Sequence, residues 1–505
     1  MRPSSTFFPS HHGAIEPFNA RRMADLSPIA RQRYSCADDL YIEVGRAAAP
    51  PKPTPTFKAV YHALLDSADD RNLARKTAEE LLRRSLERVA RQSDDLPDSP
   101  DGLAHWMEAS AEKATAAYRD YLASRKNGAP RRYFSNRSHA LYFLQAVAPT
   151  KLVDGSWLYG TLRHCNDPRM SGLAQTYLEE LGNGDETKNH VLLYRQLLEA
   201  NALTDGNHLP DPYFEQGAVQ LALGLSTEAM LPEVIGFNLG YEQLPLHLLI
   251  TAYELNELGL DPYYFTLHVT VDNTDSGHAR KAIDAVTLNA SRYKDPAEYW
   301  HRVRAGYRLN ELGLGTTAVI EGFDNDAEIL RIFAAKSAAG AGAHSDYCRI
   351  DGRTVNEWLG GGEPISGFLR ALENKGWIVR NAAPEESRFW HLLQGDRAEM
   401  FGVFTDYELQ VICDWLRGTG SLDGLKFDVA PEDRTARPRS FRASAGVARR
   451  AGAHESRPAQ PPSVRRSAAA SHEDIGMTTE ALSPGRHWTP EGLQATQRLV
   501  QRRLQ

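Results

Sequence analysis

One segment of the chain has the residue types and spacing to bind a metal ion. His268 and Asp272 are four residues apart, so on an α-helix their side chains project from nearly the same face. An imidazole and a carboxylate placed in this way can share one ion. His278 lies ten residues beyond His268, about 80° from that face on an unbroken helix. The run from Asn273 to Gly277 favours turns over helix, so a local unwinding can return His278 to the metal.

Two other interpretations of this segment remain open. If the helix is regular, Asp275 rather than His278 takes the aligned position. Alternatively, His268 and Asp272 form an ordinary i,i+4 pair and His278 caps the following helix, in which case no metal is needed. Carboxylates from elsewhere in the chain are required before a metal site is favoured.

A second candidate ligand group lies at a corner between two predicted helices. An apolar-striped helix ends in Glu179 and Glu180, a Gly-Asn-Gly sequence follows, and the next helix begins near His190. Adjacent residues on a helix cannot face the same way, so at most one of the two glutamates points inward. Leu178 and Leu181 continue the apolar stripe, which favours Glu180 over Glu179. A plain helix-turn-helix corner without any function is the alternative.

A third candidate ligand, Glu242, lies among the apolar residues of another predicted helix. Gly236 and Gly240 precede it at a spacing that allows close contact with a neighbouring helix. A carboxylate in such surroundings is costly unless a cation meets it. The alternative is a solvated Glu242 at a frayed helix end before Pro245, with no ligand role.

Together, these segments supply three histidines and three carboxylates from three helical regions. The candidate metal ligands are Glu180, His190, Glu242, His268, Asp272 and His278. Such a mixture suits iron or manganese, and non-haem di-metal oxidases carry similar sets inside helical bundles. The ferritin-like version needs two Glu-x-x-His motifs, and we find only Glu298 to His301. Neither a His-Glu-x-x-His zinc motif nor a Gly-x-Ser-x-Gly nucleophile turn occurs.

The elements that must position these residues are mostly helices. From Val60 to Ala290, apolar residues recur at steps of three to four between charged residues, which is the helical period. This periodicity predicts an all-α fold. Beyond a hinge-like Gly/Ala/Ser stretch at Ala338–Ser345, residues Asp351–Leu416 alternate short helical and extended patterns. They indicate a small C-terminal appendage that is α+β or helical.

Both ends of the chain differ in composition from the middle. The first 55 residues are broken by prolines, and the last stretch is rich in Arg, Ala, Ser, Pro and Gly without a single lysine. Only a short helical pattern at Gly492–Leu504 interrupts this composition. Neither end buries enough apolar surface to offset the entropy of ordering it. We therefore predict a flexible arm at 1–55, a helical catalytic domain at 56–345, the appendage at 346–428 and a disordered tail at 429–505.

The composition also narrows the classes of partner. The 505 residues include 58 Lys and Arg against 65 Asp and Glu, and this net charge of −7 gives no reason to expect nucleic acid or an anionic membrane. Four scattered cysteines without a Cys-x-x-Cys pair fit a reducing, cytoplasmic compartment. No run approaches the roughly 18 apolar residues of a membrane helix, and no export signal is recognised. We expect a small-molecule substrate, and a homodimer is compatible with the sequence.

The three ligand segments, in their order along the chain, resemble the haem-oxygenase-like di-iron oxidases and oxygenases, a group also described as iron-containing redox enzymes. The resemblance covers roughly Ser138 to Ser345 and rests on Glu180-x-Gly-x-Gly…His190, Gly-x-x-x-Gly-Tyr-Glu242 and His268-x-x-x-Asp272…His278. It implies a haem-oxygenase-like helical bundle with two Fe²⁺ ions per chain. It also implies O2 as co-substrate for N-oxygenation, desaturation or C–C cleavage of a small molecule.

Carried over residue by residue, the resemblance implies that Glu180 and His190 bind from one side of the site and that Glu242 bridges the ions or binds from the middle. The remaining three ligands share the third helix, but many members of the family place the last histidine closer to the aspartate than the six residues between Asp272 and His278. Asp275 is therefore the rival of His278. Two other hypotheses keep the fold without iron, namely a hydrolytic or cofactorless enzyme and a helical binding or scaffold protein. Convergence of the six ligands would favour the oxidase.

Overall fold

The computed structural model describes residues 55–66, 71–271, 277–340, 342–360, 362, 364–394, 398–418 and 479–503. The chain divides after Thr54 into two units, and all described residues belong to the second, Pro55–Gln505. The predicted ligand Asp272 and its neighbour Asp275 lie outside the described residues. No helix of the described ranges is long and apolar enough to cross a membrane.

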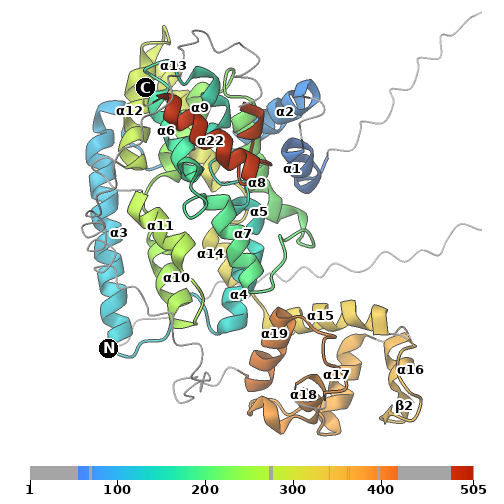
Figure 1. The fold of residues 1–505 in the computed structure, drawn as a ribbon. Coiled ribbons are helices and arrows are strands. Elements are labelled where there is room, and N and C mark those ends of the chain that lie inside the picture. Colours follow the sequence, from blue (N-terminus) through green and yellow to red (C-terminus); the bar gives the residue numbers. More distant parts are fainter. Residues whose placement is uncertain are drawn as a thin grey trace, which may run out of the picture. The chain divides into compact units, whose positions relative to one another are not determined.

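Helices dominate the described chain, and the predicted all-α fold is confirmed (Figure 1). The first helices are α1 (Phe57–Leu65), α2 (Arg71–Val89), α3 (Leu103–Lys126), α4 (Arg137–Ala146) and α5 (Ala148–Lys151). Those that carry or adjoin the candidate ligands are α6 (Ser171–Glu180), α7 (His190–Ala200), α8 (Glu215–Leu225), α9 (Leu231–Tyr241), α10 (Leu246–Glu257), α11 (Tyr263–Val271), α12 (His278–Ala290) and α13 (Pro296–Arg308). Short 3₁₀ segments are η1 (Pro100–Gly102), η2 (Ser156–His164), η3 (Gly182–Gly184), η4 (Asp211–Phe214), η5 (Leu309–Glu311) and η6 (Pro384–Glu386).

The region beyond the bundle helices is helical apart from one small hairpin. Its helices are α14 (Thr316–Glu321), α15 (Asn325–Gly340), α16 (Val355–Gly360), α17 (Ile365–Asn374), α18 (Arg388–Leu393) and α19 (Asp406–Arg417), and α22 (Pro490–Arg503) follows later in the chain. Strands β1 (Arg349–Ile350) and β2 (Arg353–Thr354) pair antiparallel, with Arg349 opposite Thr354. Sequence patterns left open whether the appendage predicted at 346–428 is α+β or helical, and helices prevail in its described residues.

Helices α15 to α19 share a hydrophobic cluster with helices of the bundle. Phe333 and Ile412 belong to the same cluster as Phe143 and Leu255. A polar contact accompanies this packing, because the backbone N–H of Ser138 at the start of α4 donates to Asp414 of α19 over 2.8 Å. The region predicted as an appendage therefore buries its apolar side chains together with those of the bundle.

Two glycines let α9 and α13 pack backbone against backbone. A Cβ atom on Gly236 would lie 1.8 Å from the carbonyl oxygen of Val303, and one on Gly306 would lie 2.1 Å from that of Glu233. The structure thus confirms that Gly236 allows a close helix contact. Because α9 runs directly into its C-cap residue Glu242, this packing determines where that carboxylate enters the bundle.

Part of the predicted disordered tail is folded. Residues 479–503, within the tail predicted at 429–505, form a turn-rich stretch followed by α22, and Leu482, His487 and Thr496 are buried. The prediction was wrong here because the few apolar and small residues of this segment pack on the bundle rather than on one another. Helix α22, red in Figure 1, lies against η3. Residues 419–478 and 1–54, which hold the rest of both predicted ends, lie outside the described residues.

Candidate metal centre

A left-handed turn brings the end of α6 and the start of α7 together. Gly182, Asn183 and Gly184 all have positive φ angles, of 64°, 52° and 84°. This conformation costs little for glycine and is tolerated by asparagine, which explains the Gly-Asn-Gly sequence. The turn reverses the chain, so that Glu180 Oε2 lies 2.5 Å from His190 Nδ1.

Asp154, which is not among the ligands predicted from the sequence, joins this pair. It lies between α5 and η2, with Oδ2 at 3.2 Å from His268 Nε2 and 3.9 Å from His190 Nδ1. Gly155 follows with φ of 77°, and a Cβ there would lie 2.9 Å from the Cβ of Glu180. A glycine at this position therefore lets the loop carry Asp154 right up to Glu180.

A second group of donor atoms forms on the other side of Glu180. Glu180 Oε1 lies 3.2 Å from His278 Nδ1, and the same nitrogen lies 3.1 Å from Glu242 Oε2. His278 is the first residue of α12 and Glu242 caps the end of α9. His278 therefore begins the next helix, as one interpretation of the sequence expected, and also faces the carboxylates.

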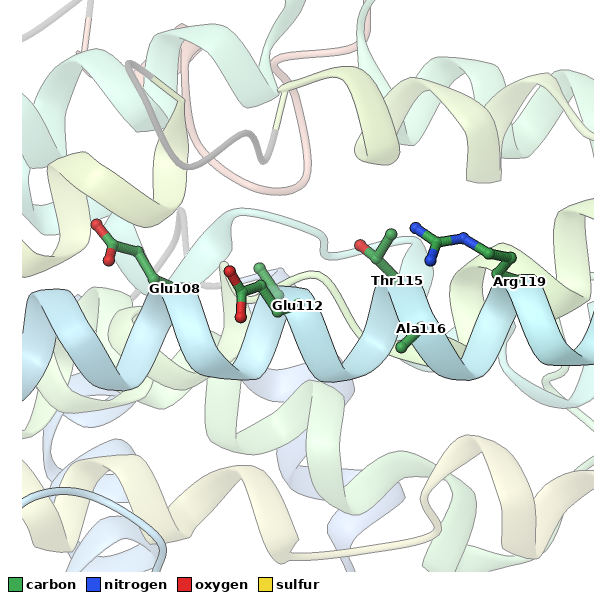
Figure 2. Close-up of a pocket in the computed structure, with 6 residues that line it drawn as sticks. Glu108, Glu112, Thr115, Ala116 and Arg119 are labelled. Carbon is green, nitrogen blue, oxygen red and sulfur yellow. The ribbon is translucent and has the colours of Figure 1, made fainter.

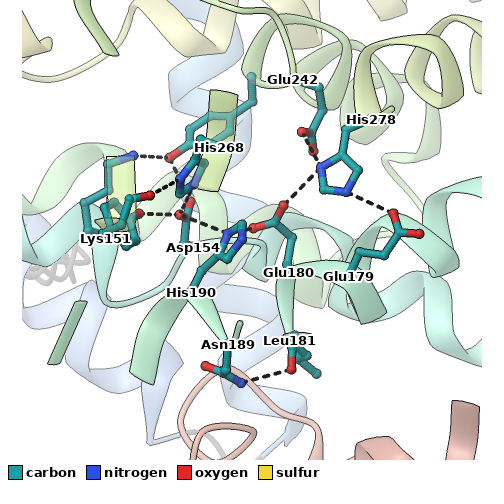
Figure 3. A network of polar contacts seen from close by, with 12 residues as sticks. Lys151, Asp154, Glu179, Glu180, Leu181, Asn189, His190, Glu242, His268 and His278 are labelled. Carbon is teal, nitrogen blue, oxygen red and sulfur yellow. Dashed lines mark hydrogen bonds and ion pairs between the residues drawn. The ribbon is translucent and has the colours of Figure 1, made fainter. Parts of the chain in front are cut away.

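Glu180 belongs to both groups, and each of its oxygens serves a different one. In the first group, donor atoms of Asp154, Glu180, His190 and His268 all lie within 4.8 Å of one another. In the second, the same holds for Glu180, Glu242 and His278. All six residues are buried, and Figure 3 shows Glu180 between the two groups.

The histidines are oriented by contacts on their far sides. His268 Nδ1 donates to the backbone oxygen of Tyr264 at 2.8 Å, which leaves Nε2 to face Asp154. His278 Nε2 donates to Glu179 Oε2 at 3.0 Å, which leaves Nδ1 to face Glu180 and Glu242. Metal-binding histidines are commonly held in this way, with the second nitrogen donating to a carbonyl or carboxylate.

The rival glutamates thus occupy different positions around His278. Glu180 is buried between the two groups, whereas Glu179 is half-buried and lies on the opposite side of the imidazole. Glu179 also contacts the ammonium of Lys281 and accepts from Gln175 at 2.9 Å. The sequence-based preference for Glu180 as the inward residue agrees with this arrangement.

Two tyrosines and a lysine surround Asp154. Tyr264 donates its hydroxyl to Oδ2 over 2.5 Å, and Tyr241 donates to Oδ1 over 3.0 Å. The Nζ atom of Lys151 donates to the Tyr241 hydroxyl over 3.3 Å. Burial alone would raise the pKa of Asp154, but the charge of Lys151 and the contact with His268 outweigh it and lower that pKa to about 2. The carboxyl group is therefore an anion at neutral pH.

Glu180 and His190 stabilise each other's charged forms. Burial would raise the pKa of Glu180, yet the charges and hydrogen bonds of His190 and His278 lower it well below its usual range. Burial would likewise lower the pKa of His190, but the negative charge of Glu180 raises it. A positive charge thus belongs beside these carboxylates, and a proton on His190 can provide it.

Comparison with known proteins finds a protein family that resembles the part of the chain around the donor groups. Residues 141–311 match the model of a family described as iron-containing redox enzymes. The match confirms the resemblance drawn from the three ligand segments and supports oxidoreductase chemistry. No curated protein and no solved structure matches the chain.

The matched span, residues 141–311, contains every residue of the two donor groups. Five predicted ligands come together there, namely Glu180, His190, Glu242, His268 and His278. Asp272 and its rival Asp275 lie outside the described residues, so their roles stay predictions. Asp154 was missed because the motifs on which the resemblance rests begin at Glu180. A lone acid between the apolar residues of Leu-Val-Asp-Gly-Ser-Trp-Leu is the signal that could have revealed it.

The donor set fits iron. Two imidazoles with carboxylates are typical of non-haem Fe²⁺ sites, and the first group offers His190 and His268 with Asp154 and Glu180. Ligands that bind one ion at right angles over about 2.1 Å lie about 3 Å apart, close to the separations of 2.5 to 3.2 Å between neighbouring donors here. The ion pairs of Asp154 and Glu180 within the described ranges are all with histidines, so a cation would relieve their buried negative charge.

Two surface hollows accompany the bundle. One runs along α3 and is lined by Glu108, Ala111, Glu112, Thr115, Ala116 and Arg119, none of which belongs to the donor groups (Figure 2). The other, of about 480 Å³, is lined by Glu186, Thr187, Leu193, Gln196 and Tyr263. Leu193 and Gln196 come from α7 and Tyr263 from α11, the helices that carry His190 and His268, whereas Glu186 and Thr187 precede α7.

Proposed function

We propose that the chain is a non-haem di-iron, O2-dependent oxidase or oxygenase that acts on a small-molecule metabolite. The observation that carries the proposal is the position of Glu180, whose two oxygens face two separate groups of buried donors. A carboxylate with one oxygen toward each group is suited to binding two neighbouring metal ions. The match to iron-containing redox enzymes supports iron as the metal.

In this proposal, Asp154, His190 and His268 would hold one iron together with Glu180. Glu242 and His278 would hold the second with the other oxygen of Glu180, and Asp272 remains a proposed ligand. Ferrous ions in such a site supply the electrons for reducing O2, which permits N-oxygenation, desaturation or C–C cleavage. The substrate determines which of these three reactions takes place.

The chain's own residues would keep the ligands fixed and the surroundings dry. Tyr241 and Tyr264 hold both oxygens of Asp154. The indole of Trp157 lies against Tyr241, with ring centroids 4.3 Å apart, and its Nε1 donates to Asn238 over 2.9 Å. Such an apolar wall excludes water and directs oxidising power to a bound substrate.

A small molecule is the class of substrate that fits these surroundings. The hollow beside α7 and α11 has a volume within the range of roughly 300 to 1,000 Å³ that is usual for small ligands. The net charge of −7 and the free cysteines Cys165, Cys348 and Cys413 support a cytoplasmic enzyme without nucleic-acid or membrane partners. A homodimer stays a prediction.

Metal loading tests the proposal. The full chain is incubated with Fe²⁺ without oxygen, desalted and assayed for iron, and we expect about two irons per chain and rapid O2 consumption afterwards. His268→Ala should lower the iron count, whereas His105→Ala, a change at an exposed residue of α3, should not. If the wild-type chain takes up no iron, the protein is a helical enzyme or binding protein without iron chemistry and the proposal is lost.

A further inference from the structure

The 479–503 segment packs on the corner that carries Glu180 and His190. Its residue Leu482 belongs to the main hydrophobic cluster of the bundle, and its backbone oxygen accepts from the Tyr177 hydroxyl of α6 at 2.6 Å. Further along, the ring of Trp488 lies under the guanidinium of Arg195 on α7, with 3.9 Å between the guanidinium carbon and the ring centroid. The segment thus holds both helices that meet at the corner.

Helix α22 also closes over the turn itself. Gln497 Nε2 donates to the backbone oxygen of Gly184 at 2.8 Å. A Cβ atom on Gly184 would lie 2.6 Å from the backbone oxygen of Leu493. The second glycine of the Gly-Asn-Gly turn is therefore needed for the approach of α22 as well as for the positive φ angle.

Asn189 is the residue through which this packing reaches the donor groups. Its Oδ1 accepts from the N–H of Leu192 at 3.0 Å and so caps α7, which begins at His190. Its Nδ2 donates to the backbone oxygen of Leu181 at 3.3 Å, next to Glu180. The same Nδ2 lies 3.2 Å from Nδ1 of His487. One amide thus joins the end of α6, the start of α7 and the 479–503 segment.

The direction of the contact with His487 follows from the chemistry of the two groups. An amide nitrogen donates only, so Nδ1 of His487 must accept, and the ring proton lies on Nε2. The imidazole is fully buried, and burial lowers its pKa to about 3, which keeps it neutral and able to accept. A permanently neutral acceptor suits a fixed structural contact.

We infer that His487 is a positioning residue for the metal centre. Through its contact with Asn189, it keeps Glu180 and His190 in their positions relative to each other. This inference rests on the proposed function for its consequence, weaker metal binding, but the clamp on the corner is a property of the metal-free chain. Without Nδ1 of His487, the side-chain NH2 group of Asn189 keeps only the backbone oxygen of Leu181 as an acceptor. The cap on Leu192 then loosens together with the start of α7.

Hydrogen exchange in the metal-free full chain tests the clamp. In His487→Ala, amide protons of the stretch from Leu181 to Leu193 should exchange about five- to tenfold faster, the effect of losing one buried hydrogen bond. His487→Asn places an amide oxygen near the position of Nδ1 and should restore slow exchange. Gln494→Ala, at an exposed residue of α22, is the matched control and should exchange as the wild type.

Metal titration of the same variants tests the consequence. We expect Fe²⁺ to bind about tenfold more weakly to one of the two sites in His487→Ala and normally in His487→Asn. The inference would be overturned if amide exchange in His487→Ala were as slow as in the wild type. It would also be overturned if exchange were as fast in His487→Asn as in His487→Ala. If the wild type binds no iron while the exchange pattern holds, the proposed function fails and the clamp stands.

A milder variant covers the case in which His487→Ala does not fold. Gln497 is exposed, so Gln497→Ala removes the contact with Gly184 without opening the core. It should speed exchange at the turn while the melting temperature stays within a few degrees of that of the wild type. Unchanged exchange at the turn in this variant would show that α22 does not hold the corner.

Discussion

His268 Nε2 lies 3.2 Å from Asp154 Oδ2, although 114 residues separate the two in the chain. His268 comes from α11, whereas Asp154 comes from a loop whose position depends on Gly155. Because Asp154 is anionic and buried, this contact places a fourth donor beside Glu180, His190 and His268. The first donor group is therefore more complete than the three ligand segments alone predict.

Replacing Asp154 with asparagine should weaken iron binding in the first donor group. The amide keeps the shape of the side chain but removes its charge, and one of its oxygens becomes an NH2 group that cannot bind a metal. We expect at least a tenfold loss of affinity for one iron, measured by Fe²⁺ titration. Asp284→Asn is the matched control, because Asp284 is a half-exposed residue of α12 that pairs with Arg280 and not with the donor groups. Full iron content at low Fe²⁺ in Asp154→Asn would exclude Asp154 as a ligand.

Substitutions of Glu179 and Glu180 should weaken iron binding to different extents. Glu179→Gln keeps a side chain that can accept from His278 Nε2 but removes the negative charge, so we expect about tenfold weaker binding of the iron held by His278. Glu180→Gln removes the shared carboxylate and should impair both sites. Iron per chain and the affinity of each site are measured for both variants. If both variants lost the same amount of iron affinity at the same sites, Glu179 and Glu180 would not have the different positions described above.

Metal binding should release protons, most clearly below neutral pH. The folded-state pKa of His190 is raised above its usual 6.5, so at pH 6.5 the imidazole is mostly protonated, and it must lose that proton to bind iron. Affinity should therefore rise with pH through the raised pKa. A weakly buffered solution with a pH indicator measures the release, which we expect to approach one proton per chain from His190 as the pH is lowered. Binding that is independent of pH between 6 and 8 would argue against His190 as a ligand.

The buried His487 should make the fold sensitive to acid. Its folded-state pKa of about 3 lies below the value near 6.5 of an unfolded chain, so the unfolded state takes up a proton first as the pH falls. The free energy of unfolding should drop by about 2 kcal/mol from this group between pH 7 and pH 5. His487→Asn removes the titrating group, so its urea unfolding should change less over that range. An identical pH dependence in both chains would contradict a neutral, buried His487.

The sequence predicts the helices of the bundle well because their apolar stripes are regular. It also predicts which of two adjacent glutamates points inward, since the apolar stripe at Leu178 and Leu181 fixes the face of α6. The glycine at 236 signals a close helix contact because no other residue tolerates the approach of α13. In each case, the prediction depends only on the residue pattern within a single helix.

Asp154 and the 479–503 segment show where such reasoning fails. Asp154 is in a loop, so no helical period marks its direction, and its partner His268 is distant in the sequence. In the 479–503 segment, Leu482 and His487 become buried only against α6 and Asn189 of another part of the chain. A segment that packs on a preformed surface needs few apolar residues of its own, so composition alone suggests disorder.

The contact between Asn189 and His487 also has a consequence for the biosynthesis of the protein. The two residues are 298 positions apart, so at roughly 5 to 20 residues per second a ribosome adds His487 some 15 to 60 seconds after Asn189. The helices that carry the donor groups emerge well before their clamp does. The proposed metal centre would then reach its full affinity for iron only after the 479–503 segment has been synthesised and has packed on the corner.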